Sequence, residues 1–99
     1  MIGSLLDVVR FLEKLGIAHT VVSNRPAVQL TFNGFALLVR WDQRLARVLV
    51  LRVDDDNDAV LDRMFVKLDD EGRVTEPALL HLITSAANGA AGAATLPSG

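Results

Sequence analysis

Residues 28–39 read VQLTFNGFALLV, and this stretch decides the fold. Asn33-Gly34 is the dipeptide preferred in two-residue type I′ hairpin turns, and alternating apolar runs flank it on both sides. The dipeptide therefore predicts an antiparallel hairpin in which Phe32 lies opposite Phe35. A slip of one residue would mix apolar and other side chains on each face, so the pattern also supports this register.

The hairpin register divides the side chains between two faces of a sheet. We call face A the face that takes Val28, Leu30, Phe32, Phe35, Leu37 and Val39. Face B takes the intervening pairs, which are Thr31 with Ala36, Gln29 with Leu38 and Ala27 with Arg40. Because face A is apolar throughout, we expect helices to cover it.

A second hairpin is expected around Asp42-Gln43-Arg44-Leu45, with Gln43-Arg44 as its turn. This register adds Trp41, Val48 and Val50 to face A. On face B it sets Arg40 opposite Arg47, Leu38 opposite Leu49 and Ala36 opposite Leu51. Two arginines directly opposite one another repel, so this register requires an acidic neighbour or is incorrect.

Helices are expected near both ends of the chain. Ser4 and Asp7 resemble a capping box before apolar residues at helical spacing, and Gly16 supplies a left-handed end. Thr75 or Glu76 is expected to cap a last helix, with Pro77 in its first turn and Asn88-Gly89 at its end. The apolar stripe expected on this last helix is Leu79, Leu80, Ile83, Ala86 and Ala87.

The connecting segments predict further short elements. Ile17 to Ser23 is typical of a strand, and Arg63 to Leu68 of another. The acidic run at 54–58 is expected to end a strand and to begin a short helical turn through Leu61, and Arg73-Val74 could return a short strand. The expected fold is a two-layer α+β domain over residues 1–89: a four- to five-stranded antiparallel meander with an N-terminal and a C-terminal helix. Residues 90–99 are expected to be a low-complexity, disordered tail.

Composition narrows the classes of function. The 99 residues carry a net charge of −2, which excludes a whole-surface attraction to nucleic acid or to an anionic membrane. There is no Cys for disulfides, thiolate metal sites or a Cys nucleophile. No stretch approaches the ~18–20 apolar residues of a membrane span, and the first residues do not resemble a signal peptide. We therefore expect a small acidic protein of the cytoplasm that has no membrane partner.

Face B carries the prediction about function. A solvated sheet face should alternate to polar residues, yet this one has an apolar centre with arginines at its rim. Either one helix covers each face, or both helices cover face A and face B meets another protein. We predict the second arrangement, with a homodimer as the simplest assembly and a partner protein or an exposed sheet edge as further options. The predicted interface consists of Ala36, Leu38, Arg40, Arg47, Leu49, Leu51 and Val53.

Charge is divided along the chain, with a net of +4 over residues 1–53 and −6 over residues 54–99. Such asymmetry could orient two subunits, or it could be neutralised within one fold. Two alternative functions follow from the charged residues. One is nucleic-acid binding through Arg40, Arg44, Arg47 and Arg52 around Trp41, although nucleic acid is not the expected partner. The other is an ion-binding protein or small metal-dependent enzyme that uses the Asp54–Asp58 loop.

The signals for catalysis are weak. Asp54, Asp56 and Asp58 alternate as in a calcium loop, but Ala59 and Phe65 occupy the positions that need Gly and Glu. His19 and His81 show no ligand spacing, and Ser4 and Thr75 are explained as helix caps. We therefore predict a protein that is not an enzyme and that has no catalytic residue, metal site or cofactor.

The predicted order of elements resembles the fold of small acidic secretion chaperones and their non-secretory relatives. That order is a helix, an antiparallel meander, a short helix, a strand or hairpin and a helix, and it covers most of residues 3–89. Those proteins are typically dimers that hold a partner chain, so the resemblance implies the same kind of function here. It rests on topology and assigns no role to any residue, and the chain is shorter than is usual for that group.

Overall fold

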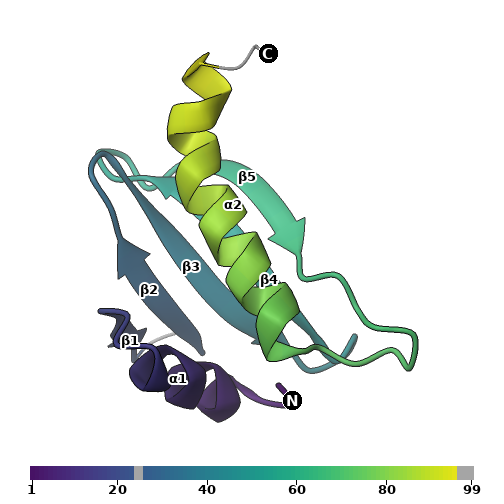
Figure 1. Cartoon of the computed structure of the whole chain (residues 1–99). Coiled ribbons are helices and arrows are strands. Elements are labelled where there is room, and N and C mark those ends of the chain that lie inside the picture. Colours follow the sequence, from purple (N-terminus) through teal and green to yellow (C-terminus); the bar gives the residue numbers. More distant parts are fainter. Residues whose placement is uncertain (24–25, 96–99) are drawn as a thin grey trace.

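The structure of the protein, a computed structural model, describes residues 1–23 and 26–95, and side chains only up to residue 88. A five-stranded antiparallel sheet has the order β1-β2-β3-β4-β5, so each strand pairs with its neighbours in sequence (Figure 1). The predicted α+β meander with a helix near each end is therefore confirmed. The elements are α1 (Leu5–Lys14), β1 (Thr20–Val22), β2 (Ala27–Thr31), β3 (Phe35–Asp42), β4 (Arg47–Asp54), β5 (Val60–Phe65) and α2 (Glu76–Thr95).

The β2–β3 hairpin has the predicted register, with Leu30 opposite Leu37 and Val28 opposite Val39. The predicted turn type is wrong. Gly34 has a φ of +88°, but Asn33 is not among the residues with positive φ, whereas a type I′ turn needs positive φ at both central positions. One left-handed glycine is thus sufficient to close this turn.

The β3–β4 register is shifted by two residues from the predicted one. Arg40 lies opposite Leu49, and Asp42 lies opposite Arg47. The connection is a four-residue loop, residues 43–46, rather than the two-residue turn Gln43-Arg44. The shift replaces the repulsive pairing of Arg40 with Arg47 by a pairing of opposite charges. Because the shift is an even number of residues, every side chain keeps the face that was predicted for it.

Strand β5 begins earlier than expected. It covers Val60–Phe65, so the predicted helical turn through Leu61 is wrong, and the strand ends before Leu68. A register irregularity lies between Arg52 and Val53, where β4 pairs with β5. The short returning strand expected at residues 73–74 is instead an isolated bridge between Val74 and Ile2.

Helix α1 begins as predicted. The Ser4 side chain accepts a hydrogen bond from the Asp7 backbone N–H at 3.3 Å, and the Asp7 carboxylate accepts one from the Gly3 N–H at 2.8 Å. Gly16 follows the helix with a φ of +71°. Strand β1 is shorter than the predicted segment from Ile17 to Ser23.

Helix α2 begins as predicted but ends later. The Thr75 hydroxyl accepts a hydrogen bond from the Ala78 N–H at 3.3 Å, which caps the helix. The prediction that Asn88-Gly89 ends it is wrong, because the helix continues to Thr95 through a segment rich in alanine, the strongest helix former. Residues 96–99 of the expected tail lie outside the described residues, and the division of the chain at residue 89 stays a prediction.

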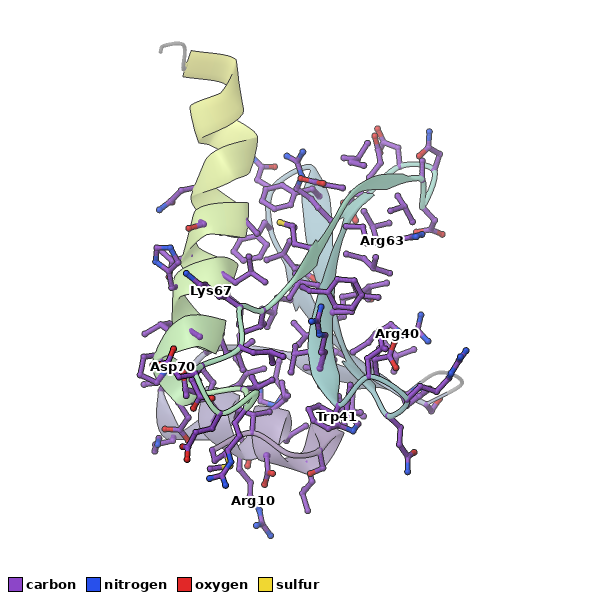
Figure 2. The ribbon with its side chains drawn as sticks, turned by 90° about the vertical axis from the view of Figure 1, so that its right-hand side faces the viewer. Arg10, Arg40, Trp41, Arg63, Lys67 and Asp70 are labelled. Atoms are coloured by element: carbon purple, nitrogen blue, oxygen red, sulfur yellow. The ribbon has the colours of Figure 1, made fainter. Side chains whose placement is uncertain are left out.

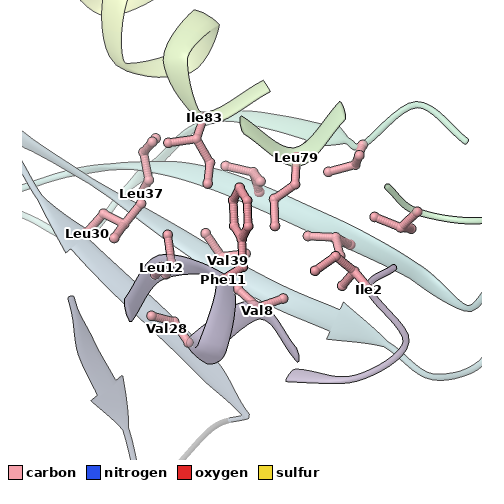
Figure 3. Close-up of a cluster of buried hydrophobic side chains, with 14 of the residues drawn as sticks. Ile2, Val8, Phe11, Leu12, Val28, Leu30, Leu37, Val39, Leu79 and Ile83 are labelled. Carbon is pink, nitrogen blue, oxygen red and sulfur yellow. The ribbon is translucent and has the colours of Figure 1, made fainter. Parts of the chain in front are cut away.

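Both helices pack on face A (Figures 1 and 3). Val8, Phe11 and Leu12 of α1 and Leu79 and Ile83 of α2 join one buried cluster with the face A residues of the sheet. Phe32, Phe35 and Trp41 pack at its margin. The buried face A residues are Val28, Leu30, Leu37, Val39, Val48 and Val50. The prediction that face A lies under helices is confirmed, and each helix covers the same side of the sheet.

Candidate protein-interaction surface

Face B lies on the side of the sheet opposite the two helices. Figure 2 shows the sheet nearly edge-on, with Arg40 and Arg63 on the side turned away from α1 and α2. Both helices bury their apolar residues in the face A cluster. Within the part of the chain that the structure describes, face B therefore has no helix packed over it.

The strand register brings the predicted interface residues together on face B. Arg40 lies opposite Leu49, Leu38 opposite Leu51, and Ala36 opposite Val53. Arg47 lies opposite Asp42, which precedes the loop. All seven predicted residues thus occupy adjacent positions on the two central strands, although their cross-strand partners differ from the predicted ones.

Exposure divides this set in two. Ala36, Leu51 and Val53 are at most 7% exposed, so they offer little surface to a partner. Leu38, Leu49, Arg40 and Arg47 are half-buried and present the accessible part of the predicted surface. The accessible apolar centre is therefore smaller than the sequence predicts, with Leu38 and Leu49 as its main members from the central strands.

Strand β5 adds a residue that the sequence interpretation missed. Phe65 lies opposite Leu49 and is 40% exposed, and the Arg47 guanidinium carbon lies 5.4 Å from the centre of its ring. This is a cation–π contact, and it places an aromatic side chain next to the apolar centre. Phe65 falls inside the strand predicted from Arg63 to Leu68, but its place beside Leu49 follows from the β4–β5 pairing, for which the sequence offers no local signal.

One end of face B is positively charged. We call it the arginine end and define it by Arg40, Arg44 and Arg47, with Asp42 as the acidic residue among them. A shallow hollow of about 250 Å³ lies here, lined by Arg40, Trp41, Asp42, Gln43, Arg44 and Leu49. The Asp42 carboxylate accepts a hydrogen bond from the Leu45 N–H at 3.1 Å, which fixes the loop that carries Arg44.

The other end is acidic. We call it the aspartate end and define it by Asp55, Asp56 and Asp58 in the β4–β5 connection. A smaller hollow of about 60 Å³ is lined by Gln29, Ala36, Leu38, Val53, Asp54, Asp55 and Asp58. The two ends are separated by the length of β3 and β4, so face B has an electrostatic direction along its strands.

Turn formation accounts for two residues of the acidic run, Asp54 and Asp58. The Asp54 carboxylate accepts a hydrogen bond from the Asp56 N–H at 2.8 Å, and Asp58 has a φ of +57°, a conformation that Asp tolerates. Two backbone hydrogen bonds, from the Asp54 N–H to the Ala59 carbonyl and from the Asp58 N–H to the Asp54 carbonyl, close the connection. Among the described residues, no group of three His, Cys, Asp or Glu side chains is placed to hold a metal ion.

The basic group of the nucleic-acid alternative is divided by the fold. Arg52 lies opposite Leu37, which belongs to face A, whereas Arg40 and Arg47 belong to face B and Arg44 to the loop beyond it. Trp41 packs against the core cluster, as its face A register predicts. Three of the four arginines therefore share one end of the molecule, and Arg52 is separated from them by the sheet.

The two histidines lie on different elements. His19 precedes β1, and its Nδ1 lies 2.9 Å from the Ile17 carbonyl oxygen, whereas His81 is exposed on α2. Ser4 and Thr75 act as helix caps. His19 lines a hollow of about 170 Å³ with Thr20, Gln29 and Thr31, at the β1 side of face B and away from its apolar centre.

Comparison with known proteins gives no match: neither a protein-family model, nor a curated protein, nor a solved structure is significantly similar to the chain. The order of elements also departs from that of the secretion chaperones, because β5 occupies the place of the expected short helix. In the described part of the chain, no helix has an apolar stretch long enough to cross a bilayer.

Proposed function

We propose that this protein is a non-enzymatic interaction module that binds another protein chain, a second copy or a different partner, through face B. The single observation that carries the proposal is that α1 and α2 both pack on face A, so that neither is left to cover the apolar centre of face B. Soluble monomers rarely leave a contiguous apolar sheet face open to water.

The arrangement of residues supports a protein partner rather than a small ligand. Leu38, Leu49 and Phe65 form an apolar centre, and arginines stand around it, which is the usual anatomy of a protein–protein interface. Arginine and aromatic residues are also the types that most often carry the binding energy of an interface. The hollows at its two ends are shallow and measure about 250 Å³ and about 60 Å³. Both are smaller than the pockets of about 300–1,000 Å³ that typically enclose a small molecule.

The sheet edge is the less suitable surface. Strand β5 forms one edge, but it carries the charged residues Asp62 and Arg63, and an irregularity interrupts its pairing with β4. Charges and bulges are the features by which proteins prevent edge-to-edge pairing. We therefore assign the interaction to face B and not to the edge.

The proposal is tested by replacing Leu38 and Leu49 with Asp and measuring the native mass of the protein in cell extract by gel filtration. We expect the parent chain to elute well above the mass of a monomer and the Leu38→Asp/Leu49→Asp variant to elute as a monomer. A matched control is Leu6→Asp/Leu80→Asp, because these leucines are 56% and 39% exposed on the helices. A parent chain that elutes as a monomer contradicts the proposal, and so does a control that dissociates equally.

A further inference from the structure

The two ends of face B carry opposite net charge. At the arginine end, three arginines and Asp42 leave a net charge of +2, and the three aspartates of the aspartate end give −3. Asp55, Asp56 and Asp58 are exposed, so their charge is available to a partner. Between the two ends lies the apolar centre around Leu38, whose partner in the register is Leu51.

This distribution makes face B complementary to itself in one orientation. Two copies that meet face to face by a two-fold rotation have their axis in the plane between the sheets. An axis along the strands would set arginine end on arginine end. An axis across the strands reverses the strand direction and sets the arginine end of each copy on the aspartate end of the other.

We propose that the chain covering face B is a second copy of this protein, related by a two-fold axis that crosses β3 and β4 near the Leu38–Leu51 pair. This inference rests on the proposed function and names its partner. In this arrangement Arg40, Arg44 and Arg47 of each copy face Asp55, Asp56 and Asp58 of the other. The arginine-lined hollow of one copy then lies against the aspartate-lined hollow of its partner.

The size of the surface predicts a dimer of modest affinity. With eight residues in β3 and five strands, the sheet measures about 26 Å by about 19 Å at standard strand spacings. Two such faces bury about 1,000 Å² in total, which is at the lower end of specific interfaces. The opposed charges at two symmetric places therefore decide both the orientation and much of the stability of the dimer.

Arg63 provides an internal control. It is exposed on β5 opposite Leu51, level with the proposed axis, so in the dimer it faces the Arg63 of the other copy. Replacing it with Glu exchanges one like-charge pair for another and should leave dimerisation unchanged. The same change at the arginine end reverses an attraction.

The test uses two charge-reversal variants of the whole chain and sedimentation velocity of the purified proteins up to about 100 µM, because an interface of this size suggests micromolar affinity. Arg40→Glu/Arg47→Glu turns the arginine end to −2. Asp55→Lys/Asp56→Lys/Asp58→Asn turns the aspartate end to +2, and Asn is used at position 58 because it tolerates the positive φ of that residue. Circular dichroism establishes that each variant is folded.

We expect the wild-type protein to dimerise and each variant alone to dimerise at least about tenfold more weakly. The chain that carries both sets of changes should dimerise again, since its two ends have opposite charges once more. If that chain fails to fold, an equimolar mixture of the two variants supplies the same attraction and should form the heterodimer.

Three results would overturn the inference. The first is a purified wild-type protein that stays monomeric although the extract experiment shows a larger complex that depends on face B. In that case the proposed function stands, and the partner is a different chain. The second is a wild-type dimer that Arg40→Glu/Arg47→Glu does not weaken, because an axis along the strands predicts no loss. The third is a folded chain with both sets of changes that remains monomeric.

Discussion

Asp42 lies directly opposite Arg47 in the β3–β4 pair, and its carboxylate also accepts the Leu45 N–H at 3.1 Å. One residue therefore holds the loop through a hydrogen bond and places a negative charge opposite Arg47 at the first position of the hairpin. The two-residue turn that the sequence suggested would have paired Arg47 with Arg40. The four-residue loop avoids that repulsion, and it does so with Ala46 at a φ of +50°.

The Asp42 contact predicts a difference between two substitutions. Asp42→Ala removes the acceptor for the Leu45 N–H and should lower the free energy of unfolding by about 1 kcal/mol. Asp42→Asn keeps a side-chain oxygen and should cost less than about 0.5 kcal/mol. Urea unfolding followed by circular dichroism at one protein concentration measures both. Equal losses of unfolding free energy in the two variants would show that the hydrogen bond to the Leu45 N–H is not the source of the stabilisation.

The β2–β3 turn predicts unequal sensitivity at its two central residues. Gly34→Ala should lower the free energy of unfolding by about 1–2 kcal/mol, because Gly34 has a φ of +88°. The added Cβ would meet no neighbouring atom within 4 Å, so a clash adds nothing to this loss. Asn33→Ala should change the free energy of unfolding by less than about 0.5 kcal/mol, since its φ is not positive. A type I′ turn would instead make both substitutions costly, so the pair of unfolding curves distinguishes the two turn types.

Neighbouring leucines of α2 test the position of that helix. Leu79 is fully buried, and Leu79→Ala should lower the free energy of unfolding by about 2–5 kcal/mol through lost burial and a cavity. Leu80 is 39% exposed, and Leu80→Ala should cost less than about 1 kcal/mol. The reverse order of these losses in urea unfolding would mean that a different side of α2 faces the sheet.

The ion pair between the helices should contribute little. Lys14 Nζ lies 2.7 Å from Glu76 Oε1, but the two side chains are 60% and 34% exposed. A double-mutant cycle with Lys14→Met and Glu76→Gln should give a coupling of about 0.2–1 kcal/mol. In 1 M NaCl, where the Debye length is about 3 Å, this coupling should largely disappear. A larger coupling that persists in high salt would contradict the assignment of a solvated surface pair.

Local signals in the sequence were sufficient for much of the fold. Ser4, Gly16 and Thr75 mark helix boundaries through hydrogen bonds and backbone conformations that involve only nearby residues. Asn33-Gly34 set the first hairpin register, because only this pairing brings the apolar residues of face A together on one side of the sheet. The same alternation assigned each residue of β3 and β4 to its correct face, even where the pairing partner was wrong.

Where the sequence interpretation was wrong, no local signal outweighed the rest of the fold. The loop at 43–46 contains no glycine, so its length was decided by the pairing of two whole strands. The segment at Val60–Leu61 has no distinctive turn residue, and it became a strand because the exposed edge of β4 offered hydrogen-bond partners. That choice also brought Phe65 next to Leu49, which the sequence interpretation had not anticipated.

The sequence by itself determined which side chains share a face, because strand alternation is a property of neighbouring residues. Only the tertiary structure decided that both helices lie on face A, because the amphipathic pattern of a helix specifies which of its sides is buried and not which side of a sheet it covers. The alignment of the arginine end and the aspartate end along β3 and β4 was decided there too, since it depends on how segments distant in sequence pair with one another.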